Sequence, residues 1–149
     1  MKLLQSLLLM GVLVGMGAGC ATTKQVVSLP DQTQPVSSAE KARVYVFRRT
    51  GLSGAGMPAT VLDNGTKIGS MGWKGYLCWE RDPGTPLISI IWPGSNPIEK
   101  RVKFEAGHTY YLKHGVVGFI AASTLTVMTE AEGEKLLTKS KAPKLKVVN

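Results

Sequence analysis

Two histidines, His108 and His114, are the first candidates for chemistry in this chain, because an imidazole can ligate a metal ion or transfer a proton. Six positions apart in one strand, they would share a face. At about 3.3 Å per residue, however, their Cα atoms would be about 20 Å apart, too far to hold one metal ion between them. The sequence therefore predicts no metal site, with both histidines at the surface or at strand ends.

A serine in a glycine-rich segment, Ser53 within 51–56, invites comparison with a nucleophile elbow. That motif needs a glycine two residues after the serine, where this chain has Ala55, and it needs a strand-to-helix turn. No Lys-Ser or Lys-Thr pair completes a phosphate loop either. We expect a flexible loop over 50–57 that can contact a partner. An envelope hydrolase using Ser53 or His108 is the alternative, and it requires a concave pocket that unites Ser53, a histidine and a carboxylate.

The acidic residues suggest no catalytic pair. We assign Asp63 and Asp82 to turns and Glu132 to helix capping, while Glu80 and Glu99 balance nearby cations across strands. The sequence therefore predicts a protein that is not an enzyme and needs no cofactor.

Binding chemistry has a better candidate in Trp73, which lies in a turn beside Lys74, whereas Trp79 and Trp92 lie in apolar strands and belong to the core. Together with Leu52 and Ser53 of the glycine-rich loop, Trp73 and Lys74 form the predicted partner contact. The net charge of +8 suits acidic surfaces and lipid headgroups. No nucleic-acid-binding motif interleaves the basic residues with aromatic ones, so no nucleic-acid partner is expected.

The composition of the N-terminus predicts an export signal. Lys2 precedes an apolar run of 12 residues from Leu7 to Ala18, which is long enough for a signal peptide and short for a membrane span. The segment 17–20, Gly-Ala-Gly-Cys, resembles the lipobox of bacterial lipoproteins, although Gly17 stands where leucine is usual. The resemblance implies a signal peptide over 1–19 and acyl chains such as palmitate on Cys20.

The residue after the cysteine is Ala21, where aspartate would resemble an inner-membrane retention signal, so we expect the periplasmic face of the outer membrane. An ordinary cleaved signal peptide with a free Cys20 is the alternative. Cys78, in a strand-like run, is expected to be a buried, inert thiol. A Cys20–Cys78 disulfide would exclude lipidation.

The elements that follow are mostly strands. Residues 20–41 read as the lipidated cysteine and a flexible tether. Asn64-Gly65 is a strong hairpin signal, and Thr129 with Glu132 forms a capping box ahead of one short helix. Strands are predicted at 42–49, 59–62, 66–71, 76–81, 87–92, 98–104, 108–114 and 119–128. The prediction is a mainly β fold: a small antiparallel β-sandwich of seven or eight strands over 42–138, with one short C-terminal α-helix, followed by a basic tail over 139–149.

These strand and turn signatures resemble a family of small prokaryotic lipoproteins built on a domain of unknown function, and they are similar to PEGA-type β-sandwich modules. The matching segments are 42–48, 61–69, 75–76, 82–84 and 105–111. The family lends no catalytic residues. The sequence thus indicates a membrane-anchored envelope lipoprotein that acts as a non-catalytic binding or structural module, with an envelope protein or polysaccharide as partner. A subunit of a secretion or assembly complex is the remaining alternative.

Overall fold

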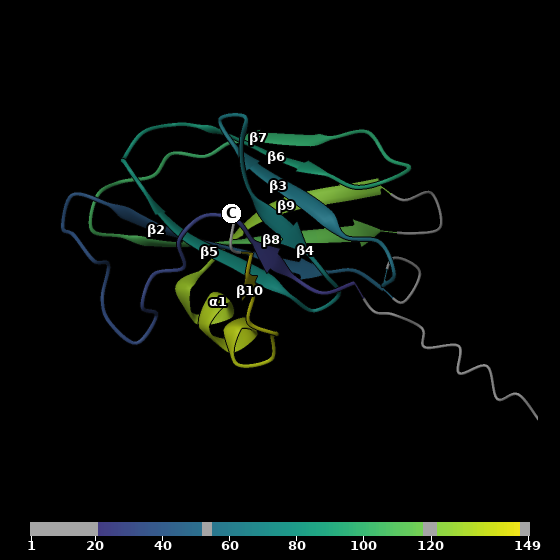
Figure 1. Ribbon diagram of the computed structural model, residues 1–149. Coiled ribbons are helices and arrows are strands. Elements are labelled where there is room, and N and C mark those ends of the chain that lie inside the picture. Colours follow the sequence, from purple (N-terminus) through teal and green to yellow (C-terminus); the bar gives the residue numbers. More distant parts are fainter. Residues whose placement is uncertain (1–20, 52–54, 118–121, 147–149) are drawn as a thin grey trace, which may run out of the picture.

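Two β-sheets pack face to face, and one short helix lies outside them (Figure 1). The computed structural model describes residues 21–51, 55–117 and 122–146. The larger sheet has the strand order β10-β1-β4-β3-β6-β7, with bounds Lys144–Leu145, Lys24–Gln25, Thr66–Met71, Ala59–Asp63, Leu87–Ile91 and Ile98–Arg101. The smaller sheet has the order β5-β2-β8-β9, with bounds Tyr76–Arg81, Ala42–Arg49, Thr109–Val117 and Ala122–Met128. The predicted mainly β sandwich with one short helix is confirmed.

Two details of the prediction differ from the structure. The described residues form ten strands because β1 and β10, of two residues each, join the larger sheet. The sheets are also mixed, since β2 pairs in parallel with β8 and β1 in parallel with β10. Side chains alternate in the same way in parallel and antiparallel strands, so the sequence pattern does not reveal the direction of a partner that no hairpin connects.

Strand β2 carries apolar residues on both faces because both faces are covered. Ala42, Val44 and Val46 point into the core between the sheets, and all three are fully buried. Tyr45 and Phe47 point to the opposite side, where they stack with Tyr111. As predicted, β2 is an interior strand, lying between β5 and β8.

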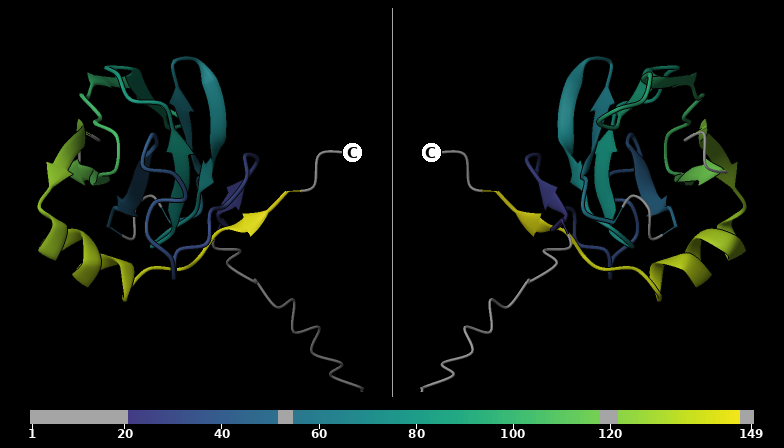
Figure 2. Two further views of the ribbon diagram at one scale, coloured as in Figure 1. Left: turned by 90° about the vertical axis from the view of Figure 1, so that its left-hand side faces the viewer. Right: turned by 90° about the vertical axis from the view of Figure 1, so that its right-hand side faces the viewer.

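The outer aromatic cluster is covered by the helix α1, Glu130–Leu137. Figure 2 shows α1 outside the smaller sheet. The predicted capping box is present: Glu132 N donates to Thr129, and the Glu132 carboxylate accepts from Thr129 N. Gly133 faces Tyr111 so closely that a Cβ there would lie 2.1 Å from the ring. The glycine that weakens the helix locally is the residue that lets it reach the sheet.

The hairpin between β3 and β4 turns at Asn64 and Gly65, as predicted. Their φ angles are 47° and 80°, the positive values that a type I′ turn requires and that asparagine and glycine tolerate.

Residues 21–41, predicted to be a flexible tether, make specific contacts with the sandwich. Gln25 is fully buried in β1, and its side-chain amide donates to Cys78 O (2.7 Å) and accepts from Cys78 N (3.0 Å). The side-chain amide thus forms the hydrogen bonds that a neighbouring strand would otherwise make with the edge strand β5. Further along, the Tyr76 hydroxyl donates to Gln32 Oε1. Single polar side chains attach this segment to the sandwich. Such contacts produce no regular spacing of hydrophobic residues, so the sequence pattern does not reveal them.

The basic tail is also partly folded. Pro143 is buried, and β10 pairs with β1 through bonds from Lys144 N to Thr23 O and from Lys146 N to Gln25 O. The N-terminal and C-terminal ends of the described chain therefore lie side by side (Figure 2).

Candidate functional site

The turn between β4 and β5 meets the start of the described chain. Thr23 is buried, and its hydroxyl accepts a hydrogen bond from Gly72 N at 2.9 Å. A Cβ at Gly72 would lie 1.7 Å from Ala21 O, and one at Gly75 would lie 1.8 Å from Thr23 Oγ1. The predicted turn over 72–75 is present, and its glycines are needed because the N-terminal residues cross it at backbone contact distance.

Trp73 and Lys74, the predicted contact residues, project from this turn. Trp73 is half-buried and donates from Nε1 to Thr50 O at 3.1 Å, which fixes the indole against the glycine-rich loop. Lys74 is exposed, with φ of 58°, and its Nζ lies 4.3 Å from the centre of the Trp73 ring in a cation–π contact. The other two predicted contact residues, Leu52 and Ser53, lie outside the described residues, as does Cys20.

The C-terminal segment completes the site. Lys141 N donates to Lys74 O at 2.8 Å, which holds the tail against the turn. A cavity of about 270 Å³ opens there, bounded by Trp73 and by residues of both chain ends: Ala21, Thr22, Thr23, Lys141, Ala142 and Lys144. The structure thus joins a tryptophan from the middle of the chain with segments that the sequence assigned to a tether and a tail.

Lys141 and Lys144 line this cavity, and Lys74 lies over the Trp73 ring. With Lys24, which is paired with Lys144, these four exposed lysines are hereafter the lysine face. Lys24 and Lys144 are directly opposite each other in the parallel β1–β10 pair, so their side chains share one face of the sheet. Within the described residues, none of the four belongs to an ion pair. Like charges in opposite positions of a ladder repel each other, and an anion would relieve that repulsion.

The two histidines fall in different environments. His108 is exposed, and its Nδ1 contacts Ala106 O at 2.9 Å. His114, expected at the surface or at a strand end, is instead fully buried within β8. It shares the inward face of β8 with the buried Leu112, so the strand alternation already contained the signal.

The surroundings of His114 keep its imidazole neutral. Burial, helped by the positive charge of Arg48, lowers the pKa of His114 to about 4. Arg48 is itself fully buried: its guanidinium donates to Met57 O and Met71 O and lies 5.8 Å from the centre of the Trp92 ring.

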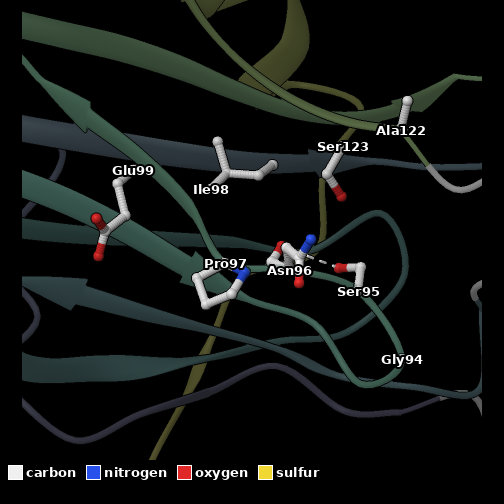
Figure 3. A pocket seen from close by; sticks show the side chains of 8 residues that line it. All are labelled: Gly94, Ser95, Asn96, Pro97, Ile98, Glu99, Ala122 and Ser123. Atoms are coloured by element: carbon white, nitrogen blue, oxygen red, sulfur yellow. Dashed lines mark hydrogen bonds between the residues drawn. The ribbon is translucent and has the colours of Figure 1, made fainter.

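A second cavity, of about 820 Å³, lies at the β6–β7 turn and the start of β9 (Figure 3). Ser123 lines this cavity, and its Oγ lies 3.3 Å from His114 Nε2. A serine–histidine nucleophile needs a basic imidazole that a third group orients. His114 Nδ1 has no hydrogen-bond partner in the described part of the chain, and a pKa near 4 makes it a weak base at neutral pH. The contact therefore serves to join β8 to β9.

The acidic side chains take structural positions. Glu80, expected to balance a nearby cation, pairs with Arg43 across β2 and β5 at 2.8 Å. Burial alone would raise the pKa of Glu80, but hydrogen bonds from Ser37 and Arg43 outweigh it and hold the pKa below its usual value. Asp63, assigned to the turn, instead accepts from Trp79 Nε1 (2.9 Å) and Arg81 Nε (2.8 Å). It occupies an inward position of β3, which an alternation count would have identified.

Among the residues that the structure describes, no group of three or more His, Cys, Asp and Glu side chains could hold a metal ion. The same residues contain no helix that is both long and apolar enough to cross a bilayer. Cys78 is a free and fully buried thiol, and burial raises its pKa to about 12.

The sequence matches no protein-family model and no curated protein.

Proposed function

We propose that this protein is a membrane-anchored lipoprotein of the bacterial cell envelope, held by acyl chains on Cys20 at the periplasmic face of the outer membrane. There it acts as a non-catalytic binding or structural module. The apolar leader and the Gly-Ala-Gly-Cys segment at 17–20 motivate the anchor. Two or more acyl chains hold a protein stably at a bilayer, because each buried CH₂ contributes about 0.8 kcal/mol.

The observation that carries the proposal is the position of the lysine face beside the entry of the chain into the domain. Three residues after Cys20, the chain is fixed by the buried Thr23. Three residues span at most about 11 Å, so an acylated Cys20 would keep the domain close to the lipid headgroups. The site at that end of the domain is basic and contains a half-buried tryptophan, a composition suited to a membrane interface.

The test is the chemical state of Cys20. We expect mass spectrometry of the N-terminal peptide to show cleavage before Cys20 and a diacylglyceryl group on its sulfur, and fractionation to recover the protein with the outer membrane. Cys20→Ser abolishes both results. Cys78→Ala is the matched control, since it removes the other, buried thiol and leaves processing unchanged. An unmodified Cys20 at the mature N-terminus, or membrane recovery of the Cys20→Ser variant equal to wild type, would refute the proposal.

A further inference from the structure

We infer that the lysine face binds anionic phospholipid headgroups, so that the domain lies on the bilayer surface in one orientation instead of turning freely about its anchor. This inference rests on the proposed function, because it requires the N-terminus of the domain to be held at a membrane. It adds the partner of the site: a lipid surface bearing negative charge.

Geometry limits which face can meet the membrane. The described chain begins at Ala21, one residue after Cys20, and Ala21 lines the cavity beside Lys141 and Lys144. Because Thr23 is buried and hydrogen-bonded to the turn, the attachment point cannot move far from this face. Of all the surfaces of the domain, the lysine face is therefore the one that an anchor on residue 20 brings to the headgroups.

Charge determines what this face prefers to meet. Lys24 and Lys144 lie side by side, and Lys141 and Lys74 are joined through their backbones. All four side chains are exposed and make no ion pair within the described residues. Each lysine close to an anionic bilayer contributes a factor of about five to binding, so a pair contributes about 30-fold.

The rigidity of the site makes the contact oriented. Trp73 is fixed to Thr50 by its indole N–H, and Lys74 lies over the Trp73 ring. Indole rings favour the headgroup region of a bilayer, where an apolar body and a polar edge are both accommodated. Trp73, with Lys74 over its ring, would thus meet the interface beside Lys141 and Lys144, which line the same cavity.

The experiment uses the mature protein purified from cells, in nanodiscs of either zwitterionic phosphatidylcholine or a mixture containing phosphatidylglycerol. An amine-reactive acetylating reagent is added, and the modification rate of each lysine is followed by peptide mass spectrometry. We expect Lys24, Lys74, Lys141 and Lys144 to react several-fold more slowly in the anionic nanodiscs, and 0.5 M salt to remove the protection. Lys67 and Lys135, which are exposed elsewhere, serve as internal references and keep equal rates.

Two double variants distinguish binding through the lysine face from binding through the net charge of the whole protein. Lys24→Gln with Lys144→Gln weakens docking about 30-fold and abolishes the protection of Lys141. Lys67→Gln with Lys135→Gln removes the same charge from other surfaces and preserves that protection. Equal rates in the two lipids, protection independent of lipid charge, or protection that survives the first double variant would overturn the inference. Protection that appears only on addition of an envelope polysaccharide or protein would do the same.

These outcomes differ from a failure of the proposed function. If Cys20 carries no lipid, mass spectrometry of its peptide reports it, whereas a protein that is lipidated and membrane-bound but unprotected refutes only the lysine face.

Discussion

Replacing His114 changes how the stability of this protein depends on pH. The pKa of His114 is about 4 in the folded protein, because the ring is buried near the charge of Arg48, and its ordinary value is 6.5. As pH falls below 6.5, the unfolded chain takes up a proton that the folded protein refuses until about pH 4. The contribution of the neutral His114 to the free energy of unfolding is therefore fully present above pH 6.5. It is lost progressively between pH 6.5 and pH 4, for a total of about 3 kcal/mol.

The measurement is urea unfolding of wild type and His114→Gln at intervals from pH 7.5 to pH 4. Glutamine removes the titration, so the variant loses about 3 kcal/mol less over this range, whatever its stability at pH 7.5. The quantity compared is the slope against pH, because the substitution also alters packing. His108→Gln is the matched control: it removes an exposed histidine and keeps the wild-type slope.

The reasoning is refuted if His114→Gln and wild type lose stability in parallel between pH 6.5 and pH 4. It is equally refuted if the His108→Gln control flattens the curve. Carboxylates such as Glu80, whose pKa is lowered by its hydrogen bonds, lose their contribution to the free energy of unfolding at lower pH. They affect wild type, His114→Gln and His108→Gln alike.

Two further substitutions test how the covering segments are attached to the sheets. Gly133→Ala raises helix propensity by about 1 kcal/mol, but we expect it to lower the melting temperature because its Cβ would overlap the Tyr111 ring. Gly56→Ala is the control, since nothing lies within 4 Å of its Cβ. A melting temperature of Gly133→Ala at or above that of wild type would contradict the packing. Gln25→Ala leaves the Cys78 main-chain N–H and C=O without the partner that the Gln25 side chain provides, so we expect the free energy of unfolding in urea to fall by about 1–3 kcal/mol. An unchanged free energy of unfolding would show that Gln25 does not hold the segment in place.

The sequence alone determined the local elements. The two-residue alternation of 42–47 predicted that β2 is covered on both faces, and both clusters are present. Asn64-Gly65 predicted the tight hairpin because few other pairs tolerate positive φ at both positions. Thr129 and Glu132 predicted the start of α1 because the capping box is complete within four consecutive residues. Each of these signals depends on near neighbours in the chain.

Tertiary structure decided how distant segments meet. The Gln25 side chain forms a hydrogen bond to a main-chain group 53 positions away. Strand β8 pairs in parallel with β2, and Thr23 packs against the turn over 72–75. None of these contacts imposes a period or a local preference on the segments that make them. The lysine face has the same origin: Lys24, Lys74 and Lys144 come from three stretches whose composition suggests a tether, a turn and a tail. They lie together because backbone hydrogen bonds, from Lys144 N to Thr23 O and from Lys141 N to Lys74 O, join residues that are far apart in the sequence.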